Sequence, residues 1–214
     1  MKMGKIIISI IVVFVAISLI GASVSVYGNS KKVVKNKTKR GEMKTFIVDW
    51  TLKNGALSNI TDFVGKDVIY EKKIVLKQAN LKKIVFDLEW EDDKALLGRF
   101  GLDSLTLTIT SPDGTVYEET VKSARKTKEG NILIGVPVNA IPSNDPIIAE
   151  NLREAEEQLD DEPYHLDNRA NKEFNVEVKV DVGEILGKIR PRDRGNNFEL
   201  NVLYEYYTAS LSED

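Results

Sequence analysis

The sequence predicts a mainly β protein: an antiparallel two-sheet sandwich, jelly-roll-like and of about eight strands, with one inserted α-helix and a single N-terminal transmembrane helix before it. Three observations predict this fold class. Residues 6–27 carry no charged side chain, residues 44–214 alternate apolar and polar residues along most of their length, and turn signals separate most of the alternating runs. Only one segment has a helical period, so the crossover helices that a parallel sheet needs are missing.

The apolar segment from Ile6 to Tyr27 is 22 residues long. A helix of that length measures roughly 33 Å and crosses the hydrocarbon core of a bilayer. We therefore expect residues 1–28 to form a transmembrane helix or signal-anchor, with the lipid bilayer as the partner of Ile6 to Tyr27. The alternative is a cleaved secretory signal, because Lys2 and Lys5 precede the densest apolar run, Ile6 to Ile20, and the small residues 21–23 and Ser25 follow that run.

Residues 29–43 are predicted to form a basic stalk, since 29–40 read NSKKVVKNKTKR without hydrophobic periodicity. Such a segment either lies on anionic headgroups or serves as a solubilising linker. Eight of the 30 basic groups and none of the 33 acidic groups lie in residues 1–40. That leaves 22 basic against 33 acidic groups in residues 41–214, so the two parts carry formal charges of +8 and −11.

The orientation in the membrane depends on competing signals. Two basic groups precede the span and six follow it, which by the positive-inside rule places the C-terminal part in the cytoplasm. The signal-like order of the N-terminus, the all-β body and glycosylation sequons at Asn36 and Asn59 favour the opposite side. We expect a single-pass protein of the cell membrane whose C-terminal domain is extracytoplasmic.

The β-sandwich domain is predicted over residues 44–214. Its clearest strand sets Phe86, Leu88 and Trp90 on one face against Asp87 and Glu89 on the other. A Ser-Pro-Asp-Gly turn at 111–114 predicts a hairpin. The predicted strands are 46–52, 68–76, 83–90, 105–110, 115–122, 132–138, 174–182 and 198–206.

The helical insertion is predicted at about 145–161, with Asp145 as N-cap and Pro146 at the first helical position. An apolar stripe and an acidic stripe then run along it: Ile148, Leu152, Ala155 and Leu159, and Glu150, Glu154, Glu157 and Asp161. Either the acidic stripe docks a basic partner, or it is a solvated outer face while the apolar stripe caps the sandwich.

Two stretches of the body carry a family resemblance. Residues 84–120, with Phe86-Asp87-Leu88-Glu89-Trp90 and then 105–109 leading into the turn at 111–115, resemble the hairpin of archaeal and bacterial surface jelly rolls of the proprotein-convertase P-domain and pre-peptidase C-terminal type. Residues 173–208 resemble the closing strand pair of the same domains. The resemblance implies a non-catalytic accessory module that stabilises, or that binds carbohydrate, protein or calcium; the helical insertion departs from the pattern.

No catalytic, cofactor-binding or metal-binding residue is assigned from the sequence. With no cysteine and one histidine, thiol catalysis and multi-histidine metal centres are excluded. Calcium is the remaining metal candidate, at the acidic runs 91–93 and 160–162, although neither has the spacing of an EF-hand loop. His165 lies in a polar loop with no nucleophile motif, so no enzyme is expected.

Two further groups bear on partners. The basic loop 188–194 lies in an acidic domain and contains no aromatic residue, so nucleic acid is not expected and pairing with the acidic helix, a protein partner or a surface layer is favoured. Tyr204 and Tyr206 are predicted to face the core, which leaves Tyr207 alone as a candidate for stacking on sugars.

The sequence therefore predicts a single-pass membrane protein that displays a non-catalytic β-sandwich as a cell-surface binding or structural module. One alternative is a subunit of a larger envelope or motility-type membrane complex. A further alternative is an accessory carbohydrate-binding or hydrolytic domain.

Overall fold

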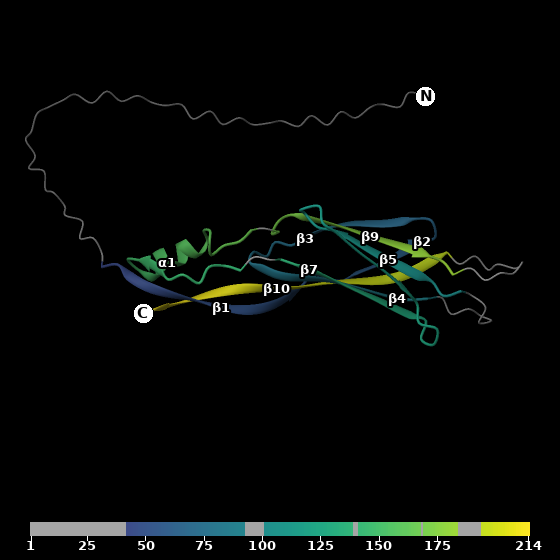
Figure 1. Cartoon of the computed structure of the whole chain (residues 1–214), viewed down its shortest axis with the longest axis horizontal. Helices are drawn as coiled ribbons and strands as arrows, with labels where there is room; N and C mark the ends of the chain where they lie inside the picture. The colour runs from purple at the N-terminus through teal and green to yellow at the C-terminus, as the bar shows by residue number, and fades with distance from the viewer. Residues whose placement is uncertain (1–41, 93–100, 139–140, 168, 184–193) are drawn as a thin grey trace, which may run out of the picture. The chain divides into compact units, whose positions relative to one another are not determined.

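The computed structural model describes residues 42–92, 101–138, 141–167, 169–183 and 194–214. In these ranges the chain forms ten strands and one helix (Figure 1). Their bounds are β1 (Lys44–Ala56), β2 (Ile60–Gly65), β3 (Ile69–Val75), β4 (Leu81–Glu91), β5 (Ser104–Thr110), β6 (Val116–Lys122), β7 (Glu129–Pro137), β8 (Ile147–Ala149), α1 (Leu152–Leu159), β9 (Glu173–Asp181) and β10 (Gly195–Glu213).

The strands make two antiparallel sheets. The six-stranded sheet has the order β7-β4-β10-β1-β8, with β2 also paired to β10, and the four-stranded sheet has the order β3-β9-β5-β6. This confirms the predicted mainly β, two-sheet architecture with one helix. All eight predicted strands are present, and the sequence missed two: β2, of which only Val64 is buried, and β8, which fell within the predicted helix.

The longest strand, β10, organises the six-stranded sheet. One of its edges pairs with β4 from Phe198 to Tyr206, while the other pairs first with β2 and then with β1, as far as Glu213. The prediction ended this strand at 206 because the apolar alternation fades there. The strand continues because β1 supplies backbone partners as far as Phe46, which lies opposite Glu213.

The inner faces of the two sheets enclose the main core. Alternate residues of β4, β5, β7, β9 and β10 are buried, as expected for strands covered on one face. The rings of Phe86 in one sheet and Phe174 in the other lie 5.9 Å apart between centroids. A buried side chain of this size contributes about 1.5–3 kcal/mol relative to an exposed one, so this layer holds the sheets together.

A second, smaller cluster lies where β1 and β10 extend beyond the four-stranded sheet. Phe46 and Val48 of β1 pack there with Ile147 and Ala149 of β8 and with Ala155 of α1. Figure 1 shows α1 beside this part of the ribbon, away from β5 and β9. The helix therefore covers one end of the β1–β10 ribbon, in line with a capping role for its apolar side.

The predicted start of the helix was wrong. The helix begins at Leu152 with Asn151, not Asp145, as N-cap, and residues 147–149 pair with Lys44–Phe46 as β8. Pairing gives this segment a period of two, with Ile147 and Ala149 buried and Ile148 60% exposed. The predicted apolar stripe is therefore reduced to Ala155 and the half-buried Leu159, because Leu152 is also exposed.

The predicted transmembrane helix at 1–28 and nearly all of the stalk at 29–43 lie outside the described residues. Within the described ranges, α1 is the only helix, and it is too short and too polar to span a membrane.

The corrected helix start gives a stability prediction. The side chain of Asn151 accepts a hydrogen bond from the Glu154 backbone N–H at 3.1 Å. Asn151→Ala should therefore lower the free energy of unfolding by about 1 kcal/mol in a urea titration. Asn144→Ala, at an exposed position before β8, is the matched control and should leave the midpoint unchanged. Equal losses in both variants would contradict Asn151 as the cap.

Candidate functional site

At one end of the sandwich, three polar side chains occupy positions where the alternation of buried apolar residues along the strands would place apolar ones. Asp92 follows Trp90 of β4, Asp103 precedes Leu105 of β5, and Asn196 precedes Phe198 of β10, each by two positions. Because alternate residues of a strand face the same side, all three occupy core-facing positions. Their exposed fractions are 1%, 0% and 2%, respectively. We call these three residues the polar layer.

The polar layer joins the two sheets. The backbone N–H of Asp103, at the start of β5, donates to Oδ2 of Asp92, at the end of β4, over 3.1 Å. The pairing of β10 with β4 begins with Phe198 opposite Trp90, so Asn196 and Asp92 lie just beyond the paired residues, at the same end of the sheet. Asp92 and Asn196 thus belong to one sheet and Asp103 to the other.

Part of the layer's hydrogen-bonding capacity is unused. Oδ1 of Asp103 accepts from the Gly183 N–H at 2.7 Å, and Asp103 takes part in a further interaction. By contrast, Oδ1 of Asp92 and both polar atoms of the Asn196 side chain are buried without a hydrogen-bond partner. A buried polar group without a partner costs about 1–3 kcal/mol, and more when it is charged. Asp92 and Asn196 therefore carry unsatisfied polar groups inside the core.

The backbone around the layer is closely packed. A Cβ atom on Gly101 would lie 2.3 Å from the Gly183 carbonyl carbon, so only glycines let these two segments touch. That contact brings the Gly183 N–H to Asp103. On another side, Ser123 donates its N–H to the Asp103 carbonyl at 2.8 Å and accepts from Trp90 Nε1 at 2.9 Å. Backbone hydrogen bonds and the hydrogen bond from the Trp90 indole thus fix the position of Asp103.

The two acidic runs that the sequence offers as calcium candidates, 91–93 and 160–162, differ in burial. In the run 91–93, Asp92 is buried rather than in a solvated loop, and Asp93 lies outside the described residues. In the run 160–162 all three side chains are exposed, and Asp161 offers its carbonyl to the N–H groups of Tyr164 and His165 in a turn. In the part of the chain that the structure describes, no three His, Cys, Asp or Glu side chains gather as a metal-binding group.

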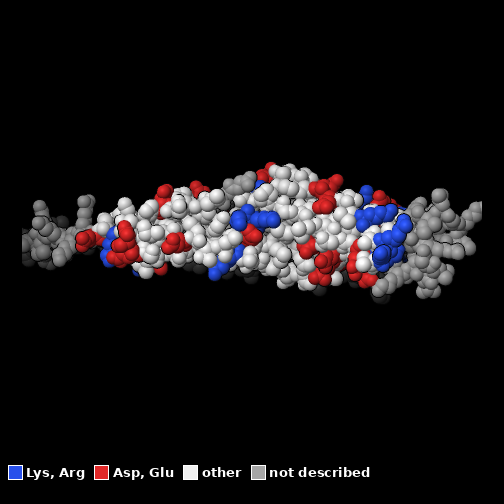
Figure 2. All heavy atoms as spheres, turned by 60° about the horizontal axis from the view of Figure 1, so that its bottom comes forward, with Lys and Arg blue, Asp and Glu red and all other residues white. Residues whose placement is uncertain are grey.

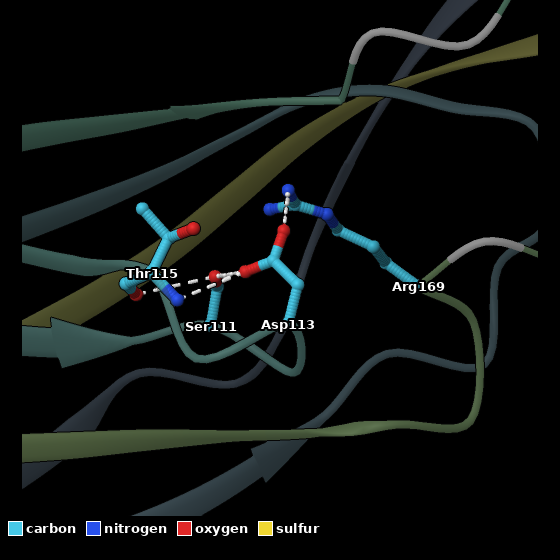
Figure 3. A network of polar contacts seen from close by, with 4 residues as sticks. All are labelled: Ser111, Asp113, Thr115 and Arg169. Carbon is cyan, nitrogen blue, oxygen red and sulfur yellow. Dashed lines mark hydrogen bonds and ion pairs between the residues drawn. The ribbon is translucent and has the colours of Figure 1, made fainter.

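A second polar network anchors the β5–β6 turn (Figure 3). Ser111 donates its hydroxyl and Thr115 its backbone N–H to Oδ1 of Asp113, while Arg169 binds Oδ2 at 2.7 Å. These contacts lower the pKa of the Asp113 carboxyl to about 2; the Ser111 hydrogen bond is the largest cause, and the Arg169 charge is a smaller one. The network ties the turn to the segment before β9, which the sequence did not predict.

The other residues singled out from the sequence are His165, the three tyrosines and the basic loop. Nε2 of His165 lies 3.0 Å from Asp167 Oδ1 in the loop after α1. The rings of Tyr204 and Tyr206 lie 5.8 Å apart between centroids, and both side chains pack half-buried against the main core. Tyr207 is half-buried. Arg194 is exposed, and the rest of the basic loop, 188–193, lies outside the described residues.

The acidic stripe predicted along the helix is partly used locally. Glu154 accepts from the Glu150 N–H at 2.8 Å, and Glu157 pairs with Arg153 at 3.0 Å. Figure 2 shows acidic and basic side chains interspersed along the face it presents, rather than gathered into one acidic patch. The acidic excess of the domain is therefore spread out on that face.

No protein-family model matches this chain, and no curated protein matches it in sequence. The resemblance to surface jelly rolls stays a prediction.

The Asp113 network gives a pH prediction. Because the pKa of Asp113 is about 2 in the folded chain and ordinarily 3.8, its contribution to stability is present above about pH 4 and is lost as the pH falls towards 2. In a carboxyl titration followed by NMR, Ser111→Ala should raise the pKa of Asp113 more than Arg169→Gln does. The reverse order would contradict the hydroxyl as the main cause.

Proposed function

We propose that the chain is a single-pass membrane protein that displays a non-catalytic, jelly-roll-like β-sandwich outside the cytoplasm, and that the displayed domains associate through the edge of β1. The uncharged segment 6–27 and the basic segment after it support the anchor. The strand nearest to them in sequence is β1, which starts at Lys44. The observation that carries the binding role is the unpaired outer edge of this strand.

Along β1, the backbone N–H and C=O groups of successive residues point alternately towards β10 and towards the outer edge of the strand. The Thr45 carbonyl accepts from the Asp214 N–H, and the carbonyls of Asp49 and Thr51 also point towards β10. In an antiparallel ladder the intervening residues then direct their N–H and C=O groups outward. At Phe46 the outer side is covered by β8, but within the described structure no backbone group pairs with it from Val48 to Asn54.

The free edge is complementary to itself. In an antiparallel pair of two β1 edges centred on Thr51, Trp50 lies opposite Leu52 and Asp49 lies opposite Lys53, each twice. Leu52 is 42% exposed, and Asp49 and Lys53 are exposed. An apolar pair would therefore form on one face and an ion pair on the other, each contributing about 0.2–1 kcal/mol. The occupant that this register favours is a second copy of the chain.

A second candidate function, a subunit of a larger envelope complex, is favoured by the opposite edge of the ribbon. The N–H of Tyr207 donates to the Asn80 carbonyl at 3.0 Å. Beyond it, from Thr208 to Glu213, β10 pairs only with β1 among the described strands, so its other side is open there. A ribbon with two open edges can add chains on both sides, and such growth continues beyond a dimer.

The topology can be tested by thiol labelling because the chain contains no cysteine. In intact cells, a membrane-impermeant maleimide should label Ser58→Cys, which lies in an exposed loop, and should label Met3→Cys only after lysis. Protection of Ser58→Cys until lysis would overturn the orientation. Loss of the Met3→Cys site from the mature chain would overturn the anchor in favour of a cleaved signal.

The edge pairing can be tested by charge exchange on the full chain in detergent. Asp49→Lys sets two lysines opposite each other at both ends of the pair and should weaken dimerisation roughly tenfold in sedimentation experiments. The double variant Asp49→Lys/Lys53→Asp restores the opposite charges and should recover the affinity. Leu52→Pro removes an outward N–H without touching the pairing to β10 and should also prevent association. A wild-type monomer, or an affinity insensitive to Asp49→Lys, would refute the pairing.

A further inference from the structure

We propose that Asn59 is an N-glycosylation site and that its glycan covers the exposed aromatic side chain of Phe63 on β2. The run Asn59-Ile60-Thr61 has the Asn-X-Thr sequence that oligosaccharide transferases recognise, and its middle residue is not proline. The inference rests on the proposed function, because modification of this sequence is found on exported chains. It deepens that function by naming where the displayed domain is modified.

The structure places both recognised side chains in solvent. Asn59 lies in the connection between β1 and β2, Thr61 is the second residue of β2, and both are exposed. Between them, Ile60 is partly buried and packs against the main core. Because alternate residues of an extended segment point to opposite sides, an inward Ile60 turns Asn59 and Thr61 outward together.

The contact with Glu199 of β10 identifies the face on which the site lies. Glu199 lies opposite Thr61 in the ladder, and Nδ2 of Asn59 donates to Glu199 Oε1 at 2.9 Å. Side chains opposite each other in an antiparallel ladder share one face of the sheet. The next residue, Leu200, is fully buried, so Glu199 points away from the core. The amide of Asn59 is therefore on the outer face of the six-stranded sheet.

The transfer reaction uses only the amide of this chain. Nδ2 of Asn59 attacks C1 of the first sugar of a lipid-phosphate-linked oligosaccharide and forms a C–N bond. The bond from C1 to the phosphate oxygen breaks with its electron pair on oxygen, and the lipid phosphate leaves. One of the two Nδ2 protons goes to a base of the transferase, and no group is oxidised or reduced. The second proton remains and can still donate to Glu199, so the observed hydrogen bond is compatible with the glycan.

The position of the site gives the glycan a role. Phe63 is 45% exposed and points to the same face as Thr61, two residues before it. Four residues of strand separate it from Asn59, which is about 13 Å. Since β2 pairs only with β10 among the described strands, this apolar ring lies beside a free strand edge. A bulky, solubilising glycan at the start of the strand would keep both from contact with other chains.

Peptide mass spectrometry tests the site in the full chain purified from the membranes of the cells that make it. Trypsin cleaves at the lysines that flank residues 54–66, and the resulting peptide contains one sequon. Most of this peptide should carry sugar on Asn59. Asn59→Gln and Thr61→Ala should both lose the sugar, whereas Thr61→Ser should keep it, since serine also completes the sequon. Asn54→Gln is the matched control, because Asn54 is in the same peptide and begins no sequon, and it should keep the sugar.

The failure of the site can be told from the failure of the proposed orientation. Lys126→Cys, in an exposed turn between β6 and β7, reports the orientation by labelling with an impermeant maleimide in intact cells. A bare Asn59 in a chain whose Lys126→Cys is labelled would overturn the site alone. A bare Asn59 with Lys126→Cys protected until lysis would overturn both. Sugar retained in Thr61→Ala would overturn the sequon as the signal.

The covering role is tested by aggregation of the full chain in detergent. Without its glycan, Thr61→Ala should pellet at a lower protein concentration than the wild type. Adding Phe63→Ser to Thr61→Ala should reverse this loss of solubility. Adding Leu133→Ser, which removes another exposed apolar side chain on β7, is the matched control and should not reverse it. Equal solubility of Thr61→Ala and the glycosylated wild type, or equal rescue by both serine substitutions, would overturn the covering of Phe63.

Discussion

The structure depends on the backbone pairing of β10, which covers most of one edge of the strand and the part from Phe198 to Tyr206 of the other. One edge holds β4 and, through it, β7; the other holds β2 and then β1. The inner face of its first half, with Phe198, Leu200 and Val202, closes the main core against the second sheet. Its second half, with Ala209 and Leu211, lines the smaller cluster under α1. A single strand thus contributes to both apolar clusters.

Much of this fold follows from the alternation of apolar and polar residues along the sequence. Leu105, Leu107 and Ile109 of β5, or Phe174, Val176 and Val178 of β9, fit no period other than that of a half-buried strand, and they are fully buried. The short run 147–149 fits a helix and a strand equally well. Its conformation is decided by pairing with Lys44–Phe46, about a hundred residues earlier in the chain, and such distant pairing is invisible to a local pattern.

The candidate site was predictable only in part, for a related reason. Extending each alternating run by two residues does place Asp92, Asp103 and Asn196 on the inner face, but their polarity is what normally marks the end of a strand. That the three segments lie at the same end of the sandwich depends on the register of β4 with β10 and on the Gly101–Gly183 contact. The Arg169–Asp113 contact likewise joins a recognised turn to a loop with no local signal.

The two apolar clusters also imply unequal resistance to opening. Among the described residues the main cluster contains 22 buried side chains and the cluster under α1 contains five. Local opening free energies scale with the buried contacts that must be broken, so amide protons of α1, β8 and the start of β1 should exchange with solvent before those of β4 or β9. The end of the domain next to the stalk in sequence is then its more labile foldon. A pulling force transmitted along the N-terminal segment would reach this labile end first and leave the main sandwich folded.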